Sequence, residues 1–134
     1  MHITGQCHCG HIRYEAEIDP AKVAICHCTD CQALTGSAFR VTVMADKRAV
    51  KQTGGAPKIY TTGSDSGRRR LQFFCPECGS PAFTTGEGED AETWGIRWGS
   101  IDQRGELSPK RQIWCDSAAP WLSSVSDLPG ASKD

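Results

Sequence analysis

The sequence predicts a mostly β domain with many loops and a thin hydrophobic core. Only 38% of its 134 residues are hydrophobic and 7% are aromatic, whereas it contains 14 glycines and 7 prolines. Between these turn-forming residues lie short segments in which apolar and polar residues alternate, the pattern of a half-buried strand. A chain of this length forms one domain, so we expect a single unit over residues 1–134, ordered from about residue 3 to residue 122, with a frayed tail over 123–134.

The first clear strand covers residues 11–18, where Ile12, Tyr14, Ala16 and Ile18 alternate with polar residues. Residues 29–34 have helical character, and Gly36 would end this short helical turn. Residues 37–44 predict a strand that is buried on most of both faces. Further strands are expected at 22–25, 49–53, 58–62, 69–74, 81–84, 93–100 and 110–116, with glycine-containing turns at 54–57 and 63–67.

The charge balance argues against several classes of partner. The formal net charge of −1 gives no basic field for nucleic acid, and no apolar run is long enough to span a bilayer. The first seven residues also lack the apolar run of a secretory signal, so we expect a cytoplasmic, reducing environment.

Arg68-Arg69-Arg70 is the only basic run, and we interpret it as part of a solvated edge strand. A clamp for the carboxylates of an acidic substrate is the alternative. We expect most tryptophans in the core and one or two at the wall of a pocket. The four tryptophans are Trp94, Trp98, Trp114 and Trp121.

Seven of the eight cysteines occur in closely spaced sets. These sets are Cys7 and Cys9, then Cys26, Cys28 and Cys31, and finally Cys75 and Cys78. In a reducing compartment thiols stay free, and such spacings then favour metal over disulfides. Zinc is preferred to an iron–sulfur cluster because the pairs predict tight knuckles and nothing resembles a ferredoxin run.

The spacing also suggests which sulfurs share an ion. The knuckle at Cys75 and Cys78 needs two more ligands, and the pair at Cys7 and Cys9, which we expect in extended backbone with both side chains on one side, supplies them. The three cysteines from Cys26 to Cys31 then form a second site. Three protein ligands leave one position for water or substrate, as in catalytic zinc sites, whereas four close the site.

Neither histidine between cysteines, His8 or His27, is a good ligand candidate, because its side chain should project away from the sulfurs. Cys115 is the main alternative. As a fourth ligand it would close the second site and leave a zinc-stabilised scaffold without chemistry. As a lone cysteine in a predicted strand it would instead be a small buried hydrophobe.

At these cysteines the sequence resembles the glutathione-dependent formaldehyde-activating enzyme family, which includes the relatives of centromere protein V. The matching stretches are Gly5–Glu15, Cys26–Phe39, Phe74–Ser80, Gly99–Asp102 and Pro120–Trp121. The resemblance implies stacked antiparallel sheets of the β-tent type. It also implies two Zn²⁺ per chain, a structural ion at Cys7, Cys9, Cys75 and Cys78 and a catalytic ion at Cys26, Cys28 and Cys31.

The activity that the resemblance implies is that of a zinc-dependent carbon–sulfur lyase or synthase, in which a thiol of the glutathione type adds to a small aldehyde such as formaldehyde. Candidates for contact with substrate or for proton transfer near the open zinc are Thr35, Ser37, His27 and Asp30. Two alternatives remain: addition–elimination on another small molecule, and a non-catalytic zinc-stabilised binding module. The sequence leaves the oligomeric state open.

Overall fold

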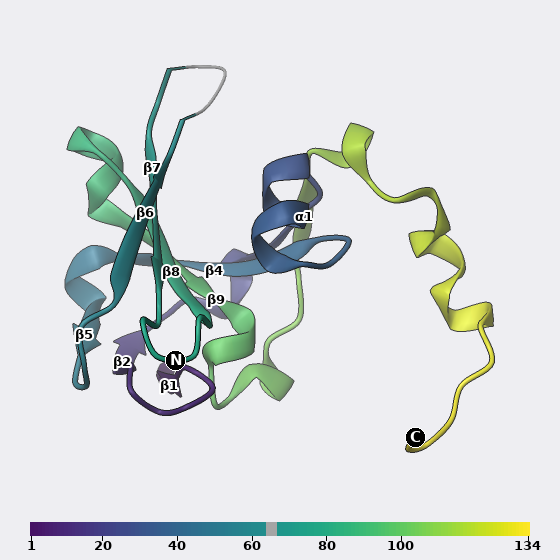
Figure 1. Ribbon diagram of the computed structural model, residues 1–134, viewed down its shortest axis with the longest axis horizontal. Coiled ribbons are helices and arrows are strands. Elements are labelled where there is room, and N and C mark those ends of the chain that lie inside the picture. Colours follow the sequence, from purple (N-terminus) through teal and green to yellow (C-terminus); the bar gives the residue numbers. More distant parts are fainter. Residues whose placement is uncertain (64–66) are drawn as a thin grey trace.

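The computed structural model describes residues 1–63 and 67–134, so the predicted turn at 63–67 falls largely on residues 64–66, outside the described part. The described residues form ten strands: β1 (His2–Gln6), β2 (Arg13–Glu17), β3 (Val23–Cys26), β4 (Arg40–Asp46), β5 (Val50–Gln52), β6 (Lys58–Thr62), β7 (Arg70–Phe74), β8 (Pro81–Gly86), β9 (Thr93–Arg97) and β10 (Arg111–Ile113). They also form one α-helix, α1 (Thr29–Thr35) (Figure 1).

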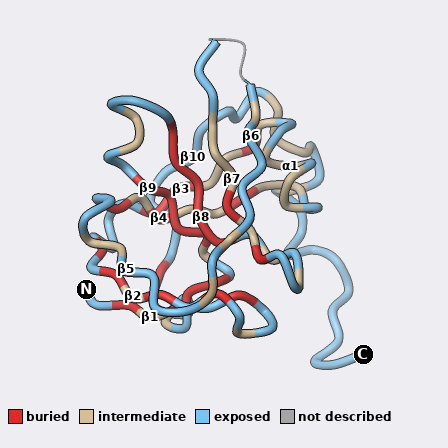
Figure 2. The backbone as a smooth tube through the Cα atoms, turned by 60° about the vertical axis from the view of Figure 1, so that its left-hand side comes forward, coloured by how far each residue is buried: buried red, intermediate tan, exposed pale blue. Residues whose placement is uncertain are grey.

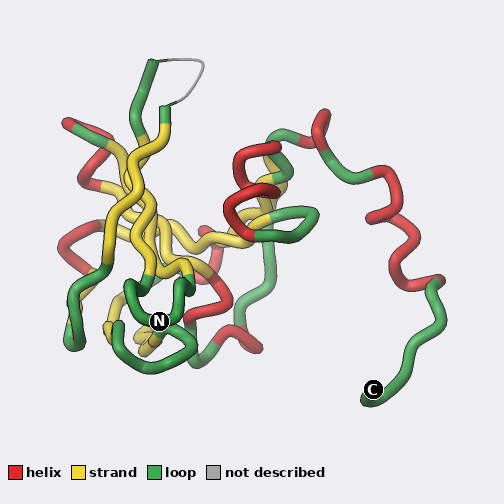
Figure 3. The backbone as a smooth tube through the Cα atoms, viewed as in Figure 1, coloured by secondary structure: helices red, strands yellow, loops and turns green. Residues whose placement is uncertain are grey.

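Short 3-10 helices lie between the strands and after the last strand, where Figure 3 shows them in red with α1. In the described residues they are η1 (Pro20–Lys22), η2 (Lys47–Ala49), η3 (Gly88–Glu92), η4 (Trp98–Ser100), η5 (Arg104–Glu106), η6 (Cys115–Ser117) and η7 (Pro120–Asp127).

The strands form two sheets. A small sheet has the order β1-β2-β5, and a large sheet has the order β10-β3-β4-β9-β8-β7-β6. Neighbouring strands in the described residues are antiparallel except that β10 pairs with β3 in parallel. The predicted class, a mostly β fold with antiparallel sheets and a short helix after the second cysteine set, is confirmed, and the parallel edge pair is an addition to it.

The hydrophobic core lies between the two sheets. Tyr14 of β2 contacts Phe83 of β8 with ring centroids 4.8 Å apart, and Trp94 of β9 lies 5.4 Å from Phe83. Figure 2 shows that the buried backbone follows these strands and β1. The fully buried large side chains are Phe83, Ile3, Ile12, Ile96, Ile101, Val23, Val43, Cys7 and Cys75. Two cysteines therefore belong to the core.

The opposite face of the large sheet is polar. Cys26 of β3 lies across from Arg40 of β4, and Thr42 of β4 lies across from Arg97 of β9. Directly opposed residues share a face of the sheet, as do residues two apart along one strand. These four side chains therefore stand on one face, and the first of them belongs to the second cysteine set.

The observed bounds of several helices and strands differ from the predicted ones. The helix over 29–34 is confirmed as α1, which Gly36 ends with a left-handed φ of 66°. The strand expected at 93–100 stops at Arg97, where η4 begins, and the strand expected at 110–116 stops at Ile113 because Trp114 has a φ of 57°. The strand β1 was not predicted, and residues 8–9 lie in a turn rather than in extended backbone.

The interpretation of the basic run as an edge strand is wrong. β7 begins only at Arg70 and pairs with both β6 and β8, so it lies inside the sheet. Arg69 forms an ion pair with Glu87, and Arg68 forms one with Asp90.

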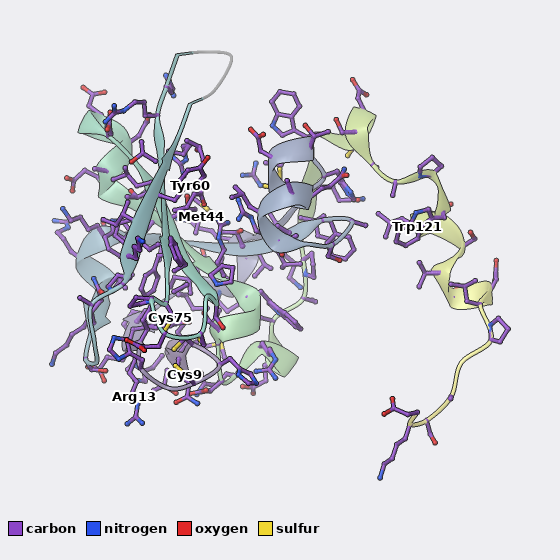
Figure 4. All side chains as sticks on the ribbon, viewed as in Figure 1. Cys9, Arg13, Met44, Tyr60, Cys75 and Trp121 are labelled. Atoms are coloured by element: carbon purple, nitrogen blue, oxygen red, sulfur yellow. The ribbon has the colours of Figure 1, made fainter. Side chains whose placement is uncertain are left out.

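The tryptophan prediction holds in part. Trp94 is buried in the core and Trp98 is half-buried, whereas Trp114 and Trp121 are exposed. The segment that carries Trp121 runs apart from the sheets (Figures 1 and 4). It is 3-10 helical through Asp127, beyond the point where the sequence predicted fraying. Among the described helices, none combines the length and the apolar character needed to cross a membrane.

Candidate functional site

Four cysteine sulfurs meet where the loop after β1 faces the loop after β7. The Sγ atoms of Cys7, Cys9, Cys75 and Cys78 all lie within 4.8 Å of one another. The Cys7–Cys9 and Cys9–Cys75 sulfur pairs are each 3.7 Å apart. A tetrahedral zinc with Zn–S bonds of about 2.3 Å separates its sulfurs by about 3.8 Å, so the group has the dimensions of a four-thiolate metal site. Two members of the group, Cys9 and Cys75, are labelled in Figure 4.

Both loops present their sulfurs in the same way. The Gly10 N–H donates to the Cys7 carbonyl at 3.1 Å, and the Gly79 N–H donates to the Cys75 carbonyl at 2.9 Å. Each glycine has a left-handed φ, 81° and 77° respectively, which most residues with a side chain avoid. The sequence predicted the knuckle at Cys75, whereas the tight turn at Cys7 replaces the predicted extended backbone.

Backbone N–H groups donate hydrogen bonds to two of these sulfurs. The Ile12 N–H donates to Cys7 Sγ at 3.2 Å, and the Cys78 N–H donates to Cys75 Sγ at 3.4 Å. Ser80 hydrogen-bonds Cys78 Sγ at 3.2 Å and lowers the pKa of Cys78 to about 5. A donor outside the ligand set, such as the Ile12 N–H, strengthens metal binding.

The second group consists of Cys26, Cys28 and Cys31, whose sulfurs also lie within 4.8 Å of one another. Cys26 ends β3, Cys28 is the N-cap of α1, and Cys31 lies in the first turn of that helix. The Cys31 N–H donates to Cys28 Sγ at 3.3 Å. Burial raises the pKa of the Cys26 thiol to about 12, so a cation is needed to hold it as a thiolate at neutral pH.

A fourth protein ligand does not join this group. In residues 1–63 and 67–134, no further cysteine, histidine or carboxylate atom lies within 4.8 Å of all three sulfurs. Cys115 is exposed, lies in η6 and belongs to neither group. The cysteines could therefore hold metal ions in two different ways, one with four protein ligands and one with three.

His27 does not join the three sulfurs. Its ring is buried, its Nε2 lies 2.7 Å from Gln112 Oε1, and its Nδ1 has no partner among the described residues. His27 lines neither of the two cavities described below. Asp30 is exposed in the first turn of α1 and also lines neither cavity.

A cavity of about 610 Å³ is lined by Cys7 of the four-cysteine group, whereas none of the three cysteines of the second group lines it. Thr35 and Ser37, both predicted as site residues, line it beside α1, and Cys7 and His8 line its other end. A second cavity of about 390 Å³ is mostly apolar, lined by residues such as Tyr60 and Phe74. Arg40 lines both cavities.

Sequence reasoning missed Arg40 and Arg97. Each is only 7% exposed, and Arg97 also lines the larger cavity. Burial, followed by the neighbouring Arg40 charge, lowers the pKa of Arg97 to about 9, although Cys31 and Cys26 act in the opposite direction. An arginine inside a strand that is otherwise apolar is the signal that could have identified both, because buried charges are rare.

The fold and these groups define a class of β-sheet protein with two cysteine groups that could hold metal ions, one of four sulfurs and one of three. The family model described as glutathione-dependent formaldehyde-activating enzyme matches residues 2–117. The chain therefore belongs to this family.

Two relatives extend the comparison. A protein of Schizosaccharomyces pombe that is named an uncharacterized lyase is 30% identical over 86 residues, which cover 62% of this chain and 59% of the yeast protein. The chain thus matches about three fifths of that relative. A crystal structure of a Rhodobacter sphaeroides protein from structural genomics is 19% identical, with a TM-score of 0.65 over 82% of this chain and 99% of the other. At that identity, the likeness concerns the fold.

Proposed function

We propose that this protein is a zinc-dependent carbon–sulfur lyase or synthase that joins a thiol of the glutathione type to a small aldehyde such as formaldehyde, and catalyses the reverse reaction. The observation that carries the proposal is the group of Cys26, Cys28 and Cys31, which has no fourth protein ligand among the described residues. Family membership and the lyase name of the yeast relative support it.

Zinc is the proposed metal in both groups because it is the usual partner of closely spaced thiolates in tetrahedral geometry. Bound to the three-cysteine group, it would supply a position at which a substrate thiol stays deprotonated near neutral pH. Free thiols in both groups require a reducing compartment, so we propose the cytoplasm as the place of action.

The chain's own residues would position the second reactant. The hydroxyl groups of Thr35 and Ser37 line the larger cavity on the side of α1, where they can hydrogen-bond a carbonyl oxygen. In the forward direction the thiol releases its proton to solvent, the carbon–sulfur bond forms as the carbonyl π bond breaks, and the oxygen that receives that electron pair takes a proton from solvent. We assign no proton transfer to His27, because its ring is buried against Gln112.

The test is an exchange experiment by NMR with ¹³C-formaldehyde and glutathione at equilibrium. Because thiols and aldehydes also combine without a catalyst, the measured quantity is the rate of exchange between hydrated formaldehyde and its thiol adduct. We expect the zinc-loaded protein to increase this rate and Cys28→Ser to abolish the increase. Cys115→Ser is the matched control, since Cys115 lies outside both groups and should retain the increase.

Two results would redirect the proposal. If the rate stays at the uncatalysed value while a thiol still binds the second ion, the enzyme acts on another small molecule. If neither thiol nor other small ligand reaches that ion, the protein is a zinc-stabilised binding module without catalysis.

A further inference from the structure

Arg40 and Arg97 are two buried cations without an acidic partner in the described residues. Both guanidinium-bearing side chains are 7% exposed, on the face of the large sheet that also carries Cys26. Three exposed arginines have carboxylate partners: Arg48 pairs with Asp46, Arg68 with Asp90, and Arg69 with Glu87. Among the described arginines, Arg40 and Arg97 are the buried ones, so their lack of such a partner leaves a charge away from water.

The hydrogen bonds of this pair are also incomplete. Arg97 donates to Thr42 Oγ1 and to Gln72 Oε1, both at 2.8 Å, and both acceptors are neutral. Among the described residues, the Nε atoms of Arg97 and Arg40 are buried with no acceptor, and Thr84 Oγ1 is also buried without a partner. A guanidinium has more N–H donors than two acceptors can take. The pair therefore retains unused donors.

The strand register brings these groups together. Thr84 lies across from Gly95, which is two residues from Arg97 on β9, so Thr84 and Arg97 share a face. A Cβ at Gly95 would lie 2.7 Å from Thr42 Cγ2 and 2.8 Å from Thr84 Cγ2, so no larger residue fits between them. Met44, which lies across from Gly95 and is labelled in Figure 4, marks the same face.

Burying a charge without a partner is unfavourable, and buried charges are normally paired. Cys31 and Cys26 of the three-cysteine group interact electrostatically with Arg97. With a divalent ion, the three thiolates of that group would carry one net negative charge. Two guanidiniums exceed this by one positive charge, which a monoanion would balance.

We propose that Arg40 and Arg97 form an anion subsite that binds a carboxylate of the substrate beside the three-cysteine group. The inference deepens the proposed function and rests on it for the thiol, which would reach the metal while its carboxylate reaches the arginines. A carboxylate fits better than a phosphate because its single charge matches the excess and its planar shape matches a guanidinium. Arg40 lines both cavities, so a ligand can reach it from solvent.

The test separates carboxylate binding from the reaction. The probes are 3-(methylthio)propionate and its neutral analogue 3-(methylthio)propanamide, whose thioether sulfur cannot become a thiolate. Binding to the zinc-loaded protein is followed by NMR at the Trp98 indole N–H and the arginine Nε–H signals, since Trp98 lines the larger cavity. We expect the carboxylate to bind at least about tenfold more tightly than the amide, the ratio of one charge-assisted hydrogen bond.

Arg40→Gln should remove this preference and Arg40→Lys should retain part of it. The matched control is Arg69→Gln, which removes an exposed arginine paired with Glu87 and should keep the full preference. If Arg40→Gln does not fold, Arg40→Lys and Arg97→Lys still test the subsite, because each should weaken the carboxylate and leave the amide unchanged.

Three results would overturn the subsite. The first is equal binding of the two probes to the wild-type protein, including no binding of either. The second is an unchanged carboxylate preference in Arg40→Gln with loss of one metal, which would mean that Arg40 only balances the thiolates. The third is that inorganic phosphate displaces the probe at a lower concentration than propionate does. Each result leaves the lyase proposal intact, because neither probe can undergo the reaction.

Discussion

Replacing Cys75 by serine should unfold the domain or bring it close to unfolding. The Cys75 side chain is fully buried, and its sulfur accepts the N–H groups of Glu77 and Cys78, each at 3.4 Å. Three losses follow from the change: metal coordination, the thiolate acceptor for two N–H groups, and a well-packed sulfur.

The magnitude can be worked from these contacts. A metal present at a thousandfold excess over its dissociation constant stabilises the folded state by about 4 kcal/mol, and that contribution disappears with the site. A buried polar group without its proper partner costs about 1–3 kcal/mol more. Together they amount to about 5–7 kcal/mol, which is comparable to the entire free energy of unfolding of an ordinary domain, about 5–15 kcal/mol.

The assay is urea unfolding followed by circular dichroism, with metal content measured on the same samples. Cys115→Ser is the control, because Cys115 is exposed and outside both groups, and its free energy of unfolding should change by less than about 0.5 kcal/mol. A wild-type unfolding midpoint in Cys75→Ser would refute the reasoning. So would a wild-type protein whose midpoint is unaffected by a strong chelator.

Three further predictions concern single residues. Cys31→Ser should lose one of two bound metals while the circular dichroism spectrum stays that of the folded protein, because its group lies outside the core cluster. Ser80→Ala should weaken metal retention in the four-cysteine group by about tenfold in a chelator competition, since Ser80 hydrogen-bonds Cys78 Sγ. Phe83→Ala should lower the free energy of unfolding by about 3–5 kcal/mol in urea, because it removes a fully buried ring that links both sheets.

Local patterns predicted those elements whose structure depends on neighbouring residues. The helix α1 formed where predicted because Gly36 adopts the left-handed conformation that ends a helix. The spacing of Cys75 and Cys78 likewise predicted a knuckle, because two sulfurs three residues apart reach one ion only from a tight turn. The grouping of that knuckle with Cys7 and Cys9 was predicted by elimination, and the structure brings these sulfurs together.

Features that depend on pairing between distant strands were beyond the reach of local patterns. The strand β10 ends at Ile113 because Trp114 turns into a left-handed conformation, and its parallel pairing with β3 joins segments more than eighty residues apart. The polar face of the large sheet has the same origin. Arg97 meets Thr42 because β9 lies beside β4, and it meets Gln72 because β7 lies only one strand beyond, on the other side of β8.

Under the proposed function, the four-cysteine group would serve stability and the three-cysteine group would serve chemistry. Cys9 and Cys75 are 66 residues apart in sequence and fasten the loop of the small sheet to the loop of the large one, so an ion there would close a long loop as well as link the two sheets. The second group lies within the six residues from Cys26 to Cys31, so an ion there would restrict little additional chain. Its ligands are half-buried at the end of β3 and the start of α1, outside the core between the sheets. Ligand exchange at an ion in the second group would therefore proceed without loosening the fold, as the proposed reaction requires.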